Sequence, residues 1–422
     1  MLNIKIKETD WFLTYIYFYL FTIPWHFSKS QISILSGILF IWAIIKFKKQ
    51  FLHRLKSTIT FLPIFLFFLF LGYLYLSSLW SNPISEGFAH VNTFEKYYFL
   101  FIPALLVSLN KQEAITSIKI LTISFGFYSI YSIMIFLGFF NSNEYGFNSG
   151  NPTGHLRYLI TTQYMLIGFF LSMLFAYYSE SKKEKSFFLI ISLLSFIGLF
   201  INNSRTSQIA FFCILLIFVL IFLKRYIFNI KGLILFFILL FSSIYFLYEN
   251  NKLERFEIAY KEVKEIFTNN SYVGSFGVRV YFNKVGLEMF KNNFLFGTGP
   301  KDNRILLQNI QKNDLNYVGD DGKGRIINHF HSEHMDILTA YGITGYMLLF
   351  TSIIILIYKL RKQPLYFYLN LSVFLSLFFN SLANKTLSVK PLNYVYIIFF
   401  LLFAIIAFNS KEDKKEKIEN NS

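Results

Sequence analysis

The sequence is poor in charge and in cysteine. Only 15% of its 422 residues are charged, and one cysteine is present. Soluble globular proteins carry about a quarter charged residues, so the low charge excludes a soluble multidomain, disordered or fibrous protein. The single cysteine, Cys213, excludes an intrachain disulfide framework. The sequence also contains no P-loop or other nucleotide-binding motif.

Apolar and aromatic residues take the place of the missing charge. Hydrophobic residues make up 55% of the chain and aromatic residues 21%, with 55 Phe and 28 Tyr. A soluble domain of this size has too little interior to bury so many apolar side chains, so the composition indicates a polytopic membrane protein. In such a protein the net charge of +16 is expected to face anionic lipid in cytoplasmic loops, and no nucleic acid partner is expected.

The length of the apolar runs predicts the fold class. A helix needs about 20 mostly apolar residues to cross roughly 30 Å of hydrocarbon. Backbone polar groups inside a membrane must be satisfied within their own segment, so these runs are predicted to be helices. We therefore expect an all-α integral membrane protein with about twelve transmembrane helices, at 11–27, 32–46, 59–80, 97–109, 115–139, 158–178, 186–201, 206–223, 232–249, 335–358, 364–383 and 391–408.

The distribution of Lys and Arg predicts which side each connection faces. With the amino terminus inside, the cytoplasmic segments hold 21 of the 40 basic residues and the five short outer connections hold six. This asymmetry obeys the positive-inside rule. We therefore expect both termini in the cytoplasm, no cleaved signal at the amino end, and a charged, disordered tail at 409–422.

One connection, residues 250–334, is long and polar and falls on the outer face. Its segments 252–266 and 279–292 repeat apolar residues every three or four positions, which predicts amphipathic helices. The loop is therefore expected to be folded and partly helical. The predicted organisation is nine transmembrane helices, the loop, three further transmembrane helices and the tail, at 1–249, 250–334, 335–408 and 409–422.

Two arginines stand out on the outer face. Arg205 lies in a short turn between two spans, where an unpaired buried charge is costly and the charge bias disfavours a cation. Arg279 opens the second amphipathic helix. Two arginines presented together grip a diphosphate bidentately, provided that the loop docks over the 202–205 turn. The alternatives are an Arg205 that reaches lipid headgroups and an Arg279 at an ordinary surface position.

Three of the seven histidines, His329, His331 and His334, lie in one short stretch. His331 and His334 are three residues apart and share a face if the stretch is helical. One imidazole is suited to act as general base, because its ordinary pKa is near neutral. A metal site with Glu333 or Asp336 as a further ligand is an alternative, although the H-x-x-H spacing lacks a partner motif. A purely structural histidine cluster is another.

Around these residues the sequence resembles the O-antigen ligase and polymerase superfamily of bacterial envelope glycosyltransferases. The resemblance rests on S-R-T at 204–206, on R-x(3)-N-K-x(3)-E-M-F and N-x-L-F-G-T-G-P between 279 and 300, and on H-x(10)-G-x-x-G from His331 to Gly345. It covers roughly 200–345 and extends to the predicted topology. The single large late loop resembles the ligases most, since the polymerases tend to have two sizeable outer loops.

The resemblance implies transfer of a glycan from an undecaprenyl-diphosphate-linked donor to the lipid A–core oligosaccharide. It implies no metal and no cofactor, and a site at the periplasmic face of the bacterial inner membrane. By position, Arg205 and Arg279 hold the donor diphosphate and His331 activates the acceptor hydroxyl. His334 is the second candidate base, because the family often has Asn after this histidine and Ser332 stands here instead.

Two other functions remain open. A polymerase uses the same donor and differs only in its acceptor. A transporter without covalent chemistry normally needs ionisable or interrupted segments near the membrane midplane. Transport is disfavoured because Lys119 is the clearest charge inside a predicted span and no matched pair of interrupted helices is apparent.

Overall fold

The computed structural model describes residues 10–28, 30–142, 151–225, 254–269, 272, 274–314 and 326–419, together with residues 238, 241, 242 and 245. All regular structure in these residues is helical, which confirms the predicted helical class. The helices are α1 (Trp11–Thr22), η1 (Ile23–Trp25), α2 (Gln31–Phe47), α3 (Lys49–Ile59), α4 (Leu62–Ser77), η2 (Ser78–Trp80), α5 (Ile84–Glu95), α6 (Tyr98–Ser108), α7 (Lys111–Phe136), α8 (Tyr158–Tyr178), α9 (Lys182–Ile201), α10 (Arg205–Arg225), α12 (Glu254–Asn269), α13 (Gly274–Asn292), α14 (Asp302–Asn313), α15 (Glu333–Leu360), α16 (Pro364–Ser381) and α17 (Lys390–Glu419).

Several of these helices are long and apolar enough to cross a membrane. Within the described residues there are seven such segments, Leu62–Trp80, Lys111–Phe136, Tyr158–Tyr178, Lys182–Ile201, Arg205–Phe222, Glu333–Leu360 and Lys390–Ser410. The pair α2 and α3, bent by 109° at Lys48, is an eighth if it counts as one span. The chain is therefore a multi-pass membrane protein.

The predicted count of twelve spans is not reached in the part of the chain that the structure describes. Helices α1 and α6 have only 12 and 11 residues, because η1 ends the first and the connection to α7 ends the second. Helix α16, at the predicted span 364–383, is also not among the seven segments, and α2, at the predicted span 32–46, counts only together with α3. The predicted span 232–249 lies almost wholly outside the described residues. The structure therefore supports seven or eight spans.

Helices α8 and α17 form the centre of the bundle. In their membrane-length segments 89% and 94% of the residues are buried inside the protein, against 33% to 50% in the other five. Both membrane-length segments carry apolar residues on every face, which is typical of a helix with neighbours on every side. Helix α8 packs against α7, α9 and α16, and α17 packs against α7, α16 and α15.

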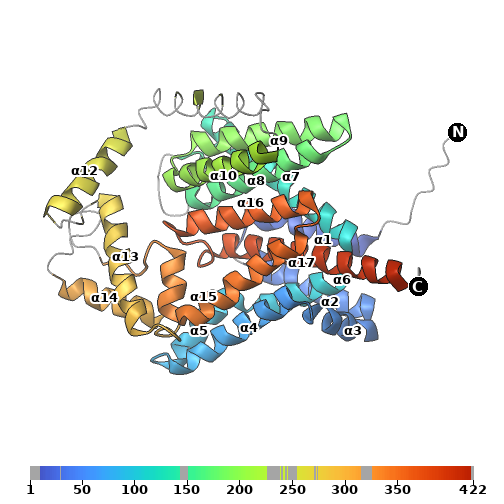
Figure 1. Ribbon diagram of the computed structural model, residues 1–422, viewed down its shortest axis with the longest axis horizontal. Coiled ribbons are helices and arrows are strands. Elements are labelled where there is room, and N and C mark those ends of the chain that lie inside the picture. Colours follow the sequence, from blue (N-terminus) through green and yellow to red (C-terminus); the bar gives the residue numbers. More distant parts are fainter. Residues whose placement is uncertain are drawn as a thin grey trace.

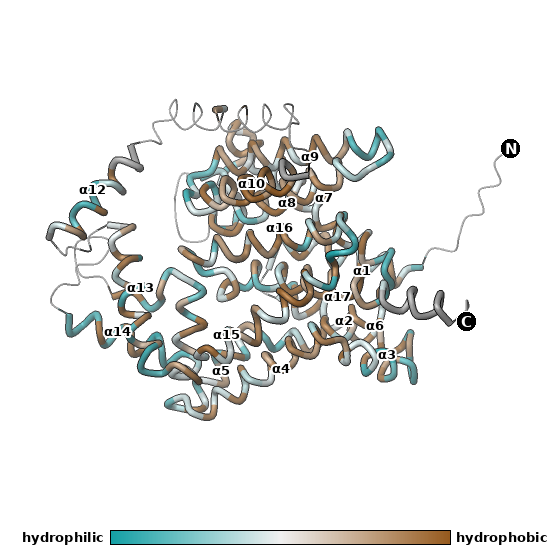
Figure 2. Tube along the Cα trace, in the orientation of Figure 1, coloured by the Kyte–Doolittle hydropathy of each residue, from teal (hydrophilic) through white to brown (hydrophobic). Residues whose placement is uncertain are grey.

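The long loop is folded into helices at one end of the molecule. The predicted helices at 252–266 and 279–292 are present as α12 and α13, and a third helix, α14, was not predicted. Figure 1 shows these helices at the end opposite to the carboxyl-terminal end of α17. In Figure 2 they carry more hydrophilic residues than the bundle helices α8, α9 and α10. Helix α13 packs on α15, which joins the loop to the bundle.

The tail differs from its prediction. Helix α17 continues to Glu419, so most of the segment 409–422 that was predicted to be disordered is helical, and only 420–422 lie outside the described residues. Its Lys and Glu residues are good helix formers. Extending an existing helix avoids the cost of a new nucleus, which the prediction from charge alone did not weigh.

Candidate active site

Helix α15 is broken at Gly342, which has φ +64° and ψ −169°. The break frees backbone groups that an intact helix uses internally, and residues 294–299 of the long loop pair with them. Four backbone hydrogen bonds make up this backbone clamp: Thr298 N to Thr339 O (2.8 Å), Gly299 N to Ala340 O (2.9 Å), Ile343 N to Phe294 O (2.8 Å) and Thr344 N to Leu295 O (3.3 Å). The clamp fixes the amino-terminal half of α15, residues 333–341, to the loop.

Glycine is required on both sides of the backbone clamp. A Cβ on Gly342 would lie 2.4 Å from the Leu295 carbonyl oxygen, and a Cβ on Gly297 would lie 2.4 Å from the Ala340 carbonyl. Both glycines have positive φ. The hydroxyl of Tyr73 on α4 lies 3.2 and 3.0 Å from two further carbonyls of the clamp, those of Phe296 and Tyr341. The G-T-G-P and G-x-x-G stretches are therefore structural elements that hold the half-helix in place.

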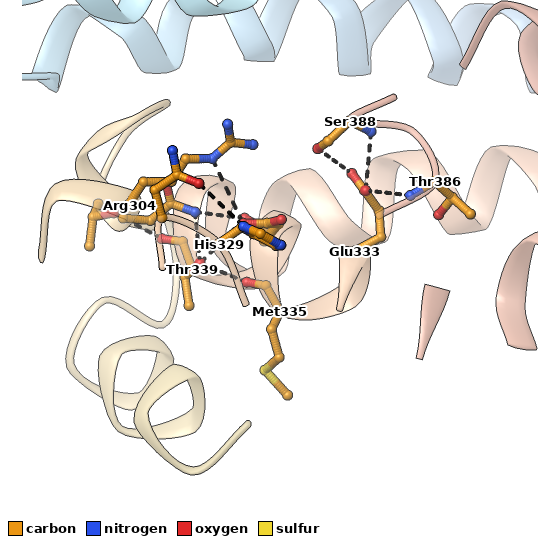
Figure 3. Close-up of polar contacts among 11 residues, drawn as sticks. Arg304, His329, Glu333, Met335, Thr339, Thr386 and Ser388 are labelled. Atoms are coloured by element: carbon orange, nitrogen blue, oxygen red, sulfur yellow. Dashed lines mark hydrogen bonds and ion pairs between the residues drawn. The ribbon is translucent and has the colours of Figure 1, made fainter. Parts of the chain in front are cut away.

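The amino end of α15 also holds the connection between α16 and α17. Ser332 caps the helix by accepting a hydrogen bond from the Met335 N–H at 3.4 Å. The buried carboxylate of Glu333 accepts hydrogen bonds from the backbone N–H groups of Thr386 and Ser388, at 2.9 and 3.1 Å, and from the Ser388 hydroxyl at 2.9 Å. Figure 3 shows Glu333 pointing toward this connection, away from Arg304.

His331 directly precedes this cap in a left-handed conformation, with φ +53°. Its ring stacks on Phe282 of α13, with centroids 5.9 Å apart and planes 11° from parallel. The His329 ring centroid is 4.2 Å away. Among the described residues neither ring nitrogen of His331 has a hydrogen-bond partner, and the side chain is partly exposed. Ring packing therefore orients this imidazole while its nitrogens stay available to a ligand.

His334 lies in a different environment. It is buried in α15, where its Nε2–H donates to the Phe378 carbonyl at 3.1 Å and its Nδ1 accepts from the Tyr346 hydroxyl at 3.2 Å. The condition under which His331 and His334 share a helical face is not met, because His331 precedes α15. The part of the chain that the structure describes contains no group of three His, Cys, Asp or Glu side chains able to hold a metal ion.

Arg205 is the first residue of α10, and polar contacts fix this end of the helix. The Ser207 hydroxyl donates to the Asn380 side-chain oxygen of α16 at 2.9 Å and lies 3.1 Å from the Thr162 hydroxyl of α8. These contacts tie the start of α10 to two bundle helices. Arg205 is partly exposed at this position.

Arg279 on α13 interacts electrostatically with both Arg205 and His331. Its Nε–H donates to the Ala383 carbonyl, in the α16–α17 connection, at 3.3 Å. Burial lowers the pKa of Arg279, Tyr158 opposes that shift, and the neighbouring Arg205 lowers the pKa further. Burial, then Arg279, then Lys385 lower the pKa of His331 to about 4. The structure therefore brings the predicted residues Arg205, Arg279 and His331 into one electrostatic neighbourhood.

Two charged residues that were not predicted, Lys385 and Arg304, act on this group together with His329 of the histidine cluster. Burial lowers the pKa of Lys385 to about 8, with Asp336 opposing the shift and Arg304 adding to it. Burial lowers the pKa of His329 to about 2, and Lys385, His331 and Arg304 lower it further. Lys385 carried a usable signal, since a lysine in a short outer connection opposes the charge bias in the same way as Arg205. Arg304 carried none, because it is one of many basic residues in the long loop.

The comparison with known families agrees with these residues. Residues 190–350 match the O-antigen ligase family. The matched range begins in α9, ends in α15, and contains Arg205, Arg279, His331 and the glycines of the backbone clamp. A comparison with curated proteins finds no match. The resemblance seen in the sequence is confirmed, and the chain carries a domain of the O-antigen ligase family at residues 190–350.

Proposed function

We propose that this protein is an O-antigen ligase. It transfers a glycan from undecaprenyl diphosphate to the lipid A–core oligosaccharide at the periplasmic face of the bacterial inner membrane, with both of its termini in the cytoplasm. The observation that carries the proposal is the grouping of Arg205, Arg279 and His331, all partly exposed, inside the range that matches the ligase family.

The two arginines suit a diphosphate. Arg205 and Arg279 carry like charges that repel each other. An anion that binds between them offsets this repulsion, so the pair favours anion binding. Guanidinium groups bind phosphate oxygens bidentately, and no metal is needed to supply the positive charge. The same charges stabilise the diphosphate as it leaves, when its negative charge is greatest.

His331 suits the role of general base. In the transfer step an acceptor hydroxyl oxygen forms a bond to the anomeric carbon of the donor sugar, the bond from that carbon to the diphosphate oxygen breaks, and the hydroxyl proton passes to His331. Its ring nitrogens have no hydrogen-bond partner among the described residues, whereas both nitrogens of His334 are occupied. His331 is therefore the favoured base of the two.

The test of this function is transfer by the purified protein in detergent. Wild-type protein is expected to move glycan from a synthetic undecaprenyl-diphosphate-linked donor to core oligosaccharide. Arg279→Ala is expected to lose transfer by about a hundredfold or more, because two charge-assisted hydrogen bonds are worth about 1.5–3 kcal/mol each. Lys284→Ala, which removes a cation from the same helix, is the control and is expected to stay near wild type. Normal transfer by Arg279→Ala contradicts its role.

A deletion strain distinguishes the ligase from the polymerase, which uses the same donor. Loss of a ligase leaves long glycan chains on the lipid carrier, because nothing moves them to core. Loss of a polymerase leaves single repeat units attached to core, because chains are no longer extended. Long carrier-linked chains that disappear on complementation support the ligase, and single repeats on core refute it.

A further inference from the structure

Asp336 is a buried carboxylate whose hydrogen-bonding capacity is unused. Its residue is 4% exposed, and neither side-chain oxygen has a hydrogen-bond partner within the described ranges. The ion pair with Arg304 is loose, with 3.9 Å between Asp336 Oδ1 and Arg304 Nε, and that Nε is also buried without a hydrogen-bond partner. Buried polar atoms are almost always hydrogen-bonded, so unused atoms on both partners point to a missing third group.

The backbone around this pair is fixed by the same contacts that build the site. The side-chain amide of Asn303, next to Arg304 on α14, donates to the Asp336 carbonyl at 3.2 Å and to the Thr339 hydroxyl at 3.0 Å. Residues 333–341, which carry Asp336, are held by the backbone clamp. The backbone on both sides of the ion pair is therefore held in place.

The Arg304–Asp336 pair lies next to the histidines of the site. Arg279 acts on His331, whereas Arg304 acts on His329, whose ring lies beside that of His331. Figure 3 shows Arg304 and His329 together at the amino end of α15. The Arg304–Asp336 pair is thus linked to His331 through the neighbouring ring of His329.

A hydroxyl group matches the two unused polar groups. It donates its proton to a carboxylate oxygen and accepts from a guanidinium N–H through its own oxygen, so it satisfies both unused groups at once. A phosphate, in contrast, would meet the negative charge of Asp336. We propose that Asp336 and Arg304 bind hydroxyl groups of the acceptor sugar next to His329. The assignment of this sugar as acceptor rests on the proposed ligase function.

The experiment measures binding and transfer separately on the full-length protein in detergent. The probes are core oligosaccharide freed of its acyl chains, and undecaprenyl diphosphate. The first variant is Asp336→Asn, which keeps the side-chain shape. The second is Arg304→Gln, which changes a residue of the loop helix α14 and tests the same pair if the first variant folds poorly. Lys301→Gln is the matched control, because it removes a cation from the same end of α14 and its partner is Glu86.

Both variants are expected to raise the dissociation constant and the KM for core oligosaccharide about tenfold or more. The control is expected to leave these values within about twofold, and all three proteins are expected to bind undecaprenyl diphosphate like wild type. Unchanged acceptor binding in both variants overturns the proposal, as does a wild type that binds no core oligosaccharide or variants that lose donor affinity equally. Acceptor binding that depends on Asp336 without any transfer by wild type keeps this subsite and refutes the ligase function.

Discussion

Replacing Gly342 by Ala tests whether the backbone clamp holds the site. Gly342 has φ +64° and ψ −169°, a conformation that is nearly restricted to glycine and costs other residues about 1–3 kcal/mol. The new Cβ would lie 2.4 Å from the Leu295 carbonyl oxygen, so the two backbone segments of the clamp must separate. That separation breaks the hydrogen bonds of Ile343 and Thr344 to the loop, worth about 1 kcal/mol each. The total loss is about 3–5 kcal/mol.

The assay is thermal unfolding in detergent together with glycan transfer. Gly342→Ala is expected to unfold at a lower temperature and to lose transfer, because the half-helix 333–341 is no longer held against the loop. Gly72→Ala is the control, since Gly72 lies on α4 beside Tyr73 and a Cβ there has no atom within 4 Å. Alanine in a helix interior is favourable by roughly 0.5–1 kcal/mol, so this control is expected to be no less stable than wild type. Equal unfolding and transfer in the two variants would refute the structural role of the break.

Three further predictions concern the chemistry. His331→Ala is expected to be inactive. His334→Ala is expected to keep part of the activity and to unfold at a lower temperature, because His334 joins α15 to α16 through the Phe378 carbonyl. The reverse order of activities would show that His334 is the base. EDTA is expected to leave transfer unchanged, since guanidinium groups stabilise the leaving group; a loss that a divalent ion restores would revive a metal site. The acidic limb of the kcat/KM profile is expected near pH 4, because His331 in the free protein gains its proton there as the pH falls. The acidic limb of the kcat profile is expected at a higher pH, because the bound donor diphosphate raises the pKa of His331. Limbs at the same pH in both profiles would show that the donor does not influence the base.

The periodicity of the sequence was sufficient to predict much of the helical framework. The predicted span 158–178 is α8 with the same bounds, because a long apolar run can satisfy its backbone in one way only. The amphipathic repeat likewise predicted α13. The pairing of Arg205 with Arg279 was expected from charge and chemistry, and it depended on the loop folding back onto the bundle.

Other features depend on contacts that a local pattern does not contain. The apolar run at 335–358 predicted a continuous span, whereas residues 294–299 supply the hydrogen bonds that allow α15 to break at Gly342. The role proposed for Asp336 was likewise not visible, because the sequence placed it beside histidines as a possible metal ligand. Its partner in the fold is Arg304, more than thirty positions earlier in the chain.

The lowered pKa of His331 links donor binding to the strength of the proposed base. A histidine with a pKa of about 4 is neutral at physiological pH, but it holds a proton only weakly. Besides burial, the cation Arg279 contributes most to this low value, and Arg279 is the residue proposed to bind the donor diphosphate. The bound anion offsets that positive charge and raises the pKa of the imidazole toward its ordinary value. His331 is therefore a stronger base when the donor is bound. The acceptor hydroxyl then loses its proton only when the anomeric carbon of the donor sugar is present in the site.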